Sequence, residues 1–358
     1  MKKLYILKTL FFLSLFTALT SCGDDEEYTK VSPVVVDLNA VPYAKLSDYK
    51  FFEGDMKNQQ PAYKVLPYDL NSSLFTDYAH KKRFIWMPEG QTATFTSDSE
   101  ILNFPVGTVL IKTFYYDNVQ PNNTTRIIET RLLIRKADAW VFADYIWNED
   151  QTEATLDLNG GYTNISWDQG GTIKTANYQI PSAAECLTCH KTNDSPIPIG
   201  PKPQNLNKIF NYTEGPSDQL SRWVEEGYLD RKPDNIVSTV DWTDTSKSLD
   251  LRVRSYVDIN CAHCHKEGSH CDYMSMRFAF SETGDPENLG ICVAPQEHPS
   301  PSLTYIVAKR NPGRSALYYR INSVEPSERM PILGRTIVHD EAVALVKEWI
   351  NSMDAPCQ

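Results

Sequence analysis

Two short motifs hold the residue types best suited to chemistry. The segments Cys186–His190 and Cys261–His265 both have the form Cys-x-x-Cys-His. This spacing is the attachment signature of c-type haem. Two thiols one helical turn apart can each add to a vinyl group of the porphyrin, and the adjacent histidine then binds the iron. Two copies in one chain predict two covalently attached haem c groups.

Each motif assigns its three residues the same roles. The cysteines form thioether bonds, and the histidine is the first axial ligand of the iron. A structural zinc site also uses paired cysteines, but its two pairs are usually about 15–20 residues apart, much closer than the pairs here. A zinc-braced binding lipoprotein is therefore the weakest alternative. The predicted haem-binding residues are Cys186, Cys189 and His190 in the first motif and Cys261, Cys264 and His265 in the second.

The second axial ligands separate two kinds of function. Met330, followed by Pro331, is typical of a distal methionine loop, and we expect it to bind the second iron; Met274 and Met276 are weaker candidates. No methionine or histidine lies between the two motifs, so the first haem takes its ligand from elsewhere or has none.

His80 and Met87 are the candidates for that first haem. Two six-coordinate haems transfer electrons, whereas an open first haem would suit a dihaem peroxidase-like enzyme. Electron transfer is the favoured interpretation, and the sequence leaves open whether the protein is an enzyme.

The N-terminus predicts export and lipid anchoring. Residues 1–21 combine a basic start with a short apolar run, as in a signal peptide. Leu19-Thr20-Ser21-Cys22 resembles the lipobox of bacterial lipoproteins, in which the cysteine becomes the lipid-bearing N-terminus. The acidic run Asp24–Glu27 resembles the tethers of surface lipoproteins. We therefore expect a cell-envelope protein held to the outer membrane by its lipid anchor alone, on either the periplasmic or the surface face.

The composition and net charge of the chain indicate which classes of partner it can bind. The chain has 358 residues, of which 41% are hydrophobic and 23% charged, as in globular proteins. The net charge of −11 and the pI near 5.2 argue against nucleic-acid binding, which requires a basic face. A negative surface can instead steer a basic redox partner, such as a cytochrome or an oxidoreductase, toward the protein.

The expected fold class is multidomain α+β. Strand signals dominate residues 61–180: Gly107–Tyr116, Glu129–Arg135 and Trp140–Trp147 are rich in β-branched and aromatic residues. Asn159-Gly160-Gly161 predicts a hairpin turn between Ala154–Leu158 and Tyr162–Trp167. These signals predict an antiparallel β domain built as a sandwich.

Helical signals follow the β domain. Helices are expected at Gln219–Leu229 and at Ser246–Val257. A third helix is expected to begin at Asp340, with Val343, Val346 and Ile350 on one face. We expect two small, mainly α, cytochrome c-like haem domains after the β domain. The expected divisions are 1–21 for the signal peptide, 22–60 for the anchor and tether, 61–180 for the β-rich domain, 181–244 for the first haem domain and 245–358 for the second.

The chain resembles the dihaem c-type cytochrome lipoproteins, a family of exported bacterial proteins whose role is otherwise unassigned. The resemblance covers most of the chain after the signal peptide and implies haem and electron transfer, but no substrate. It is carried by the two cysteine motifs and by Leu66–Asn71, Leu74–Ala79, Phe104–Thr108, Gly200–Lys202, Gln204–Asn207, Gln219–Leu229, Asn311–Leu317, Met330-Pro331 and Trp349-Ile350.

Three cysteines have no role in the anchor or the haem motifs. Cys271 and Cys292 are candidates for a disulfide in an oxidising compartment, which would leave Cys357 as an odd thiol. The sequence does not fix this pairing. Arg314 and Arg320 are candidates for neutralising haem propionates, although surface ion pairing is the simpler interpretation of both.

Overall fold

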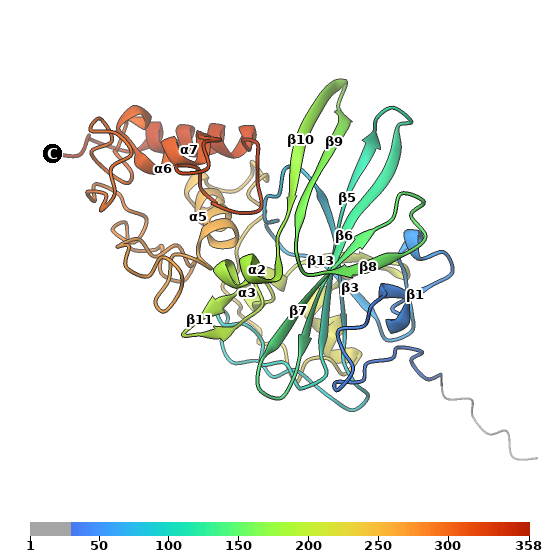
Figure 1. The fold of residues 1–358 in the computed structure, drawn as a ribbon. Helices are drawn as coiled ribbons and strands as arrows, with labels where there is room; N and C mark the ends of the chain where they lie inside the picture. The colour runs from blue at the N-terminus through green and yellow to red at the C-terminus, as the bar shows by residue number, and fades with distance from the viewer. Residues whose placement is uncertain (1–29) are drawn as a thin grey trace, which may run out of the picture. The chain divides into compact units, whose positions relative to one another are not determined.

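The strand signals form a single antiparallel sheet (Figure 1). The computed structural model describes residues 30–358, so the predicted signal peptide and Cys22 lie outside the described residues. Six strands follow the order β10-β9-β5-β6-β7-β8, while β4 pairs with β5 and with β3. The eight strands are β3 (Leu66–Tyr68), β4 (His80–Trp86), β5 (Val109–Val119), β6 (Thr124–Arg135), β7 (Trp140–Trp147), β8 (Ala154–Asp157), β9 (Gly161–Gln169) and β10 (Thr172–Ile180).

The predicted strands are found close to their expected positions, but one predicted hairpin is wrong. β6 and β7 pair across the expected turn, with Arg135 opposite Trp140. β8 pairs with β7 and β9 pairs with β10, so the turn at Gly160 joins strands that do not pair. Gly160 has a φ of +70°, and a Cβ there would lie 2.5 Å from the backbone nitrogen of Ser182. The glycine therefore serves a close backbone approach, and the hairpin lies instead between β9 and β10.

Both faces of the sheet are covered. On one face, Leu46, Tyr49 and Phe51 from the N-terminal segment pack with strand residues such as Ile111 and Tyr145. This segment contains two short 3-10 helices, η1 (Leu46–Tyr49) and η2 (Met56–Asn58), and the paired strands β1 (Phe52–Glu53) and β2 (Gln60–Pro61). Part of the stretch expected as a tether is thus core structure.

The opposite face packs against the residues that follow the first motif. Leu206, Leu220 and Trp223 share a hydrophobic cluster with Ile85 and Leu110 of the sheet. The elements after β10 are short, namely α2 (Ala183–Cys189), β11 (Lys191–Thr192), β12 (Ser195–Pro196), α3 (Pro203–Leu206), β13 (Ile209–Tyr212), β14 (Gly215–Asp218) and α4 (Gln219–Glu225).

The longest helices lie near the C-terminal end of the chain. The remaining elements are α5 (Leu249–Cys261), the 3-10 helix η3 (Pro312–Arg314), α6 (Ala316–Asn322) and α7 (Asp340–Ser352). Val343, Val346 and Ile350 of α7 are buried, as their spacing predicted. They pack with Val253 and Val257 of α5, so this part of the chain has its own hydrophobic cluster.

The expected fold class is wrong. The structure is 27% strand and 19% helix, and two small, mainly α domains do not follow the β domain. Residues 181–244 hold frequent prolines, which interrupt helices. Their apolar side chains are buried against the sheet instead of around a helical core of their own. The sandwich is also not found, because the eight strands form one sheet covered by loops and short helices.

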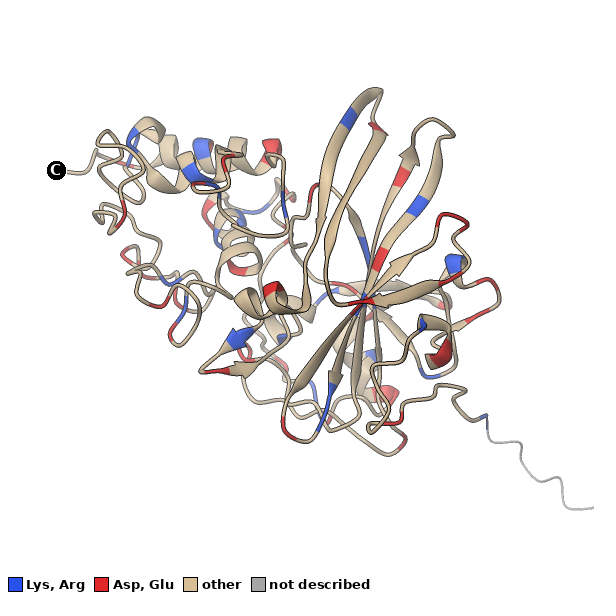
Figure 2. Ribbon diagram, viewed as in Figure 1, with Lys and Arg blue, Asp and Glu red and all other residues tan. Residues whose placement is uncertain are grey.

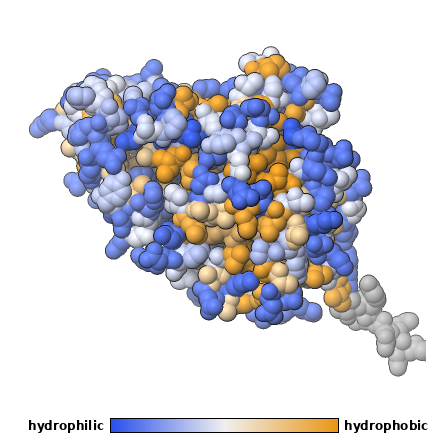
Figure 3. All heavy atoms as spheres, in the orientation of Figure 1, coloured by the Kyte–Doolittle hydropathy of each residue, from blue (hydrophilic) through white to orange (hydrophobic). Residues whose placement is uncertain are grey.

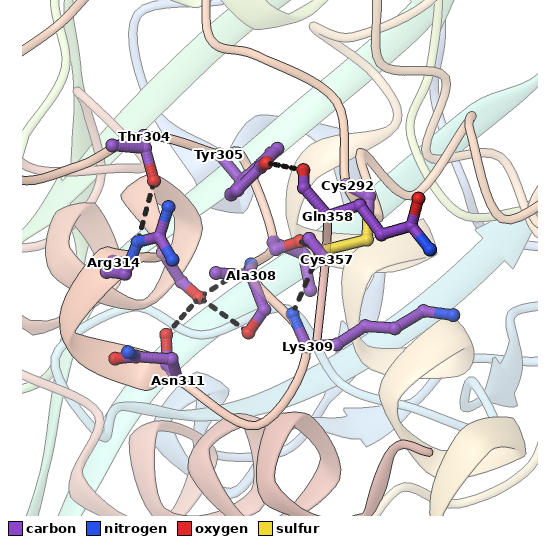
Figure 4. Close-up of a disulfide and its surroundings, with 11 residues drawn as sticks. Cys292, Thr304, Tyr305, Ala308, Lys309, Asn311, Arg314, Cys357 and Gln358 are labelled. Atoms are coloured by element: carbon purple, nitrogen blue, oxygen red, sulfur yellow. Dashed lines mark hydrogen bonds between the residues drawn. A yellow bond between two sulfur atoms is a disulfide. The ribbon is translucent and has the colours of Figure 1, made fainter. Parts of the chain in front are cut away.

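A disulfide joins Cys292 to Cys357 (Figure 4). This corrects the suggested Cys271–Cys292 pair, and Cys271 is a buried free thiol. The bond ties the C-terminal segment to Cys292, and the Lys309 backbone N–H, drawn beside it in Figure 4, donates to the Cys357 sulfur at 3.4 Å. Residues Pro33–Gln358 form one compact unit. Within residues 30–358, no helix has the length and apolar character needed to cross a membrane.

Candidate functional site

The first motif lies on α2 at the edge of a cavity. Ser182 caps this helix by accepting a hydrogen bond from the Glu185 backbone N–H, while the Glu185 carboxylate accepts one from the Ser182 N–H. This capping box fixes the start of a helix only seven residues long. Cys186 and Cys189 therefore lie one turn apart, as thioether formation requires.

His190 is held in one orientation and one protonation state. Its Nδ1 lies 2.9 Å from the Ile197 carbonyl oxygen. A carbonyl only accepts hydrogen bonds, so Nδ1 carries the hydrogen and Nε2 keeps its lone pair. Burial lowers the pKa of His190 to about 3, so the ring is neutral at physiological pH. A histidine that donates from one nitrogen to a backbone carbonyl and offers the other is the usual arrangement of a metal ligand.

A cavity lies beside His190. Its walls come from α2, from strands β5 to β7 and from two loops distant in sequence, which contribute Leu74–Thr76 and Pro331, Leu333 and Gly334. Phe142 of β7 packs against the His190 ring, with 4.9 Å between the ring centroids. Figure 3 shows apolar side chains gathered on the face of the molecule that includes α2. We call this space the first cavity.

The second motif begins at the last residue of α5. Cys261 ends the helix, and the backbone N–H of His265 donates to the Cys261 carbonyl at 3.0 Å. Burial lowers the pKa of His265 to about 4, so this ring is also neutral. Its Nδ1 is buried and has no hydrogen-bond partner in the part of the chain that the structure describes.

A second, largely apolar cavity lies beside His265. Met330 lines this cavity, so the structure brings together the two residues that the sequence predicted as axial ligands of the second haem. Met274 and Met276 line it as well. The second cavity therefore offers one imidazole and three thioethers within one apolar space.

A buried arginine holds the loop of Met330. Arg335 is 2% exposed and donates to four backbone carbonyls, including that of Met330 at 3.0 Å and that of Arg320 at 3.0 Å. Asp77 fixes the next turn by accepting from the Thr336 and Ile337 backbone N–H groups at 2.7 and 3.1 Å. The sequence contained no signal for either role, because both depend on contacts between distant segments.

The two motifs meet at their cysteines. The Cys189 and Cys264 sulfurs are 3.9 Å apart, and a ring nitrogen of His263 lies within 4.8 Å of both. As free thiols, the two cysteines are linked by a hydrogen bond that Cys264 donates to Cys189. The pKa of Cys189 is lowered, chiefly by a hydrogen bond from Cys264, and the pKa of Cys264 is raised by the same bond. The two sites are therefore neighbours.

His263 was not predicted as a functional residue, although it is one of the two variable positions of the second motif. It lines the first cavity, where it is the only imidazole besides His190 among residues 30–358. The earlier candidates for this position do not reach the cavity. His80 is exposed on β4, and Met87 is buried in the hydrophobic cluster on the sheet.

Charged side chains form part of the wall of the first cavity. Lys112, Arg131 and Asp144 project from β5, β6 and β7. Figure 2 shows charges of both signs distributed along these strands. Arg131 pairs with Glu129 at 2.5 Å and with Asp144 at 3.5 Å. These charged side chains could bind a ligand in a largely apolar cavity, and the alternating pattern of the strands did not predict that they would lie together.

Comparisons with known proteins add no family to this description. The resemblance to dihaem cytochromes therefore remains a sequence-based expectation. No protein-family description, curated protein or solved structure matches the chain.

Proposed function

We propose that the protein is a dihaem c-type cytochrome that passes electrons between two covalently attached haems and a redox partner protein. One observation carries this proposal. Each Cys-x-x-Cys-His motif borders its own cavity, and the motif's histidine lines that cavity as a neutral imidazole. A haem bound at such a site supplies one-electron exchange at its iron.

The residues around each cavity suit that group. His190 presents Nε2, because Nδ1 is engaged by Ile197. Met330 offers a thioether in the cavity of His265, and a thioether ligand raises the reduction potential relative to a second imidazole. The contact between Cys189 and Cys264 supports transfer between the two sites, because it brings the attachment edges together.

The peroxidase-like alternative depends on the first cavity. An open iron position there would admit peroxide, whereas an imidazole from His263 would close it. The His263→Ala variant tests this point. We expect it to convert the first haem from low-spin to high-spin and to create cyanide binding that the wild-type protein lacks. A wild-type protein that is already high-spin and binds cyanide would favour the enzyme.

A metal site is the second candidate, and one observation favours it. Cys189, Cys264 and His263 converge as three donors of the types that zinc prefers, and their sulfurs are close enough to bind one ion. Such a site excludes haem attachment at the same cysteines. Protein purified with zinc bound and without haem would replace the cytochrome proposal.

The decisive experiment counts haem in the mature protein. The chain is produced in cells able to attach c-type haem, and covalent haem per chain is measured by optical spectroscopy and mass. We expect two haems, and one in the Cys186→Ala/Cys189→Ala variant. Cys271→Ala is the matched control, because Cys271 is a free thiol outside both motifs, and it should keep two. Colourless wild-type protein would overturn the proposal.

We further propose that Cys22 carries a lipid and holds the protein at the outer membrane. The support is the sequence pattern at residues 1–22. A Cys22→Ala variant should move from the membrane fraction to the soluble fraction. The net charge of −11 favours a basic redox partner, so the rate of electron exchange with such a partner should fall as salt rises. A salt-independent rate would argue against electrostatic steering.

A further inference from the structure

A row of charged side chains crosses the sheet beneath the first cavity. Arg83 lies opposite Lys112, Lys112 opposite Arg131, Arg131 opposite Asp144 and Asp144 opposite Asp157. Residues directly opposite one another in antiparallel strands project from the same face. Except for Arg83, all of them line the first cavity. The row therefore forms a charged strip on the cavity floor.

Two of the three cations in this row have carboxylate partners. Arg83 pairs with Asp69 at 2.5 Å, and Arg131 pairs with Glu129 and Asp144. Lys112 has no ion pair within residues 30–358, and its ammonium lies 4.9 Å from the centroid of the Phe114 ring.

Burial, together with Arg83 and Arg131, lowers the pKa of Lys112, so its ammonium form needs a counter-charge that the neighbouring strands do not provide. Like charges directly opposite one another destabilise a sheet, and Lys112 has an arginine on each side. Such a position is suited to an anion that enters from the cavity.

We propose that Lys112 binds a propionate carboxylate of the haem in the first cavity; this inference rests on the proposed function. The vinyl groups that receive the cysteines and the two propionates lie at opposite edges of the porphyrin. Cys186 and Cys189 are on α2, whose terminal His190 packs against Phe142 of β7. β5 is two strands away from β7, about 10 Å at the usual strand spacing. Lys112 thus lies about two strand spacings from the strand that the His190 ring contacts.

The same ammonium group suggests a competing role. A deprotonated lysine can bind iron directly, and Lys112 is desolvated. The two roles differ in what the loss of Lys112 does. Loss of a propionate partner leaves the axial ligands in place and changes only the charge near the haem. Loss of an axial ligand changes the spin state of the iron.

The test uses the full-length haem-loaded protein and the Lys112→Gln variant. We expect the reduction equilibrium of one haem to shift about tenfold toward the oxidised form, or 59 mV, because an unpaired propionate stabilises the ferric iron. The second haem serves as an internal reference. Lys82→Gln is the matched control, because Lys82 is the neighbour of Arg83 on β4 and projects from the other face; both haem potentials should stay within about twofold of wild type.

The outcomes separate the two proposals. Two haems with an unchanged potential in Lys112→Gln, or a low-spin to high-spin change, would overturn the propionate assignment and leave the cytochrome intact. A wild-type chain without haem would overturn the proposed function itself. Lys112→Arg retains the charge and should retain the potential. If Lys112→Gln does not fold, Lys112→Met, with an apolar side chain of similar length, carries the same expectation.

Discussion

Replacing Glu129 by glutamine should show that the buried charges beneath the first cavity depend on one another. Glu129 is 0% exposed and accepts from Arg131 Nη2 at 2.5 Å, from Arg131 Nε at 3.0 Å and from the Tyr178 hydroxyl at 2.6 Å. Burial raises the pKa of Glu129, but Arg131 outweighs burial and the net shift is downward. The pKa of Asp144 is raised well above its usual value by burial and by Glu129. Of the two acids, Glu129 therefore ionises first, and Asp144 keeps its proton to higher pH.

The magnitude follows from these contacts. Removing one partner of a buried ion pair costs about 3–5 kcal/mol. Asp144 lies 3.5 Å from Arg131, so it can ionise when Glu129 is made neutral and recover part of that loss. We expect Glu129→Gln to lower the free energy of unfolding by about 3 kcal/mol. Asp144→Asn should lower it by about 1 kcal/mol or less, because Asp144 holds less of the negative charge than Glu129. The double variant leaves Arg131 without a carboxylate and should exceed the sum of the single effects by at least about 1 kcal/mol.

Urea unfolding followed by tryptophan fluorescence measures these differences. Glu149→Gln is the matched control, because Glu149 also pairs with an arginine, Arg126 at 2.7 Å, but is 84% exposed. Its effect should stay within about 0.5 kcal/mol. The pKa of folded Glu129 is lowered, so its contribution is fully present above its unfolded pKa and is lost as pH falls through the folded pKa. The difference between wild type and Glu129→Gln should therefore shrink in acid.

Two results would refute this reasoning. Equal losses in Glu129→Gln and Asp144→Asn would mean that the two acids share the charge evenly. Strict additivity in the double variant would mean that Asp144 does not take over the charge of Glu129.

In the haem-loaded protein, Met330→Ala should make the second haem high-spin. If Met274→Ala makes it high-spin and Met330→Ala does not, Met274 is the ligand. Arg335→Lys cannot reach four carbonyls at once and should lower the free energy of unfolding by about 2–4 kcal/mol, measured in urea; a loss below about 1 kcal/mol would show that the loop holds without it. Cys357→Ser removes a disulfide with a sequence separation of 65 and should lower the free energy of unfolding by about 4 kcal/mol. Thermal unfolding measures this loss, and a variant as stable as the wild type would contradict it. Burial lowers the pKa of His339 to about 4, below its unfolded value of about 6.5, so its contribution is present above pH 6.5 and is lost as pH falls toward 4. His339→Phe should flatten the stability profile between these pH values, and an unchanged slope would locate the titration in other groups.

Local patterns predicted local structure. The β-branched run in β5 and the helical spacing in α7 are visible in single segments, and both elements are present. The turn at Gly160 was misread because a glycine with positive φ serves a hairpin and a close backbone approach equally well. The helical haem domains were expected from the two motifs, from helical spacing in three segments and from the family resemblance, and the prolines between the motifs were given too little weight.

The candidate site divides in the same way. Residues within each motif are defined by short spacing, and Met330 was identified by its neighbouring proline and its distance from His265. The row through Lys112 and Arg131 depends on the register of several strands, which no single segment encodes. His263 belongs to the second motif, but it lines the first cavity, whose other walls lie around the first motif. Its position there could not be read from its own segment.

The first cavity takes its walls from residues as far apart as Leu74 and Gly334. A chain synthesised from its N-terminus forms the sheet first, then α2 with Cys186, and only near the end the loop of Leu333 and Gly334. The first cavity is therefore complete only when almost the whole chain is present, and a chain that ended before Pro331 would lack one of its walls.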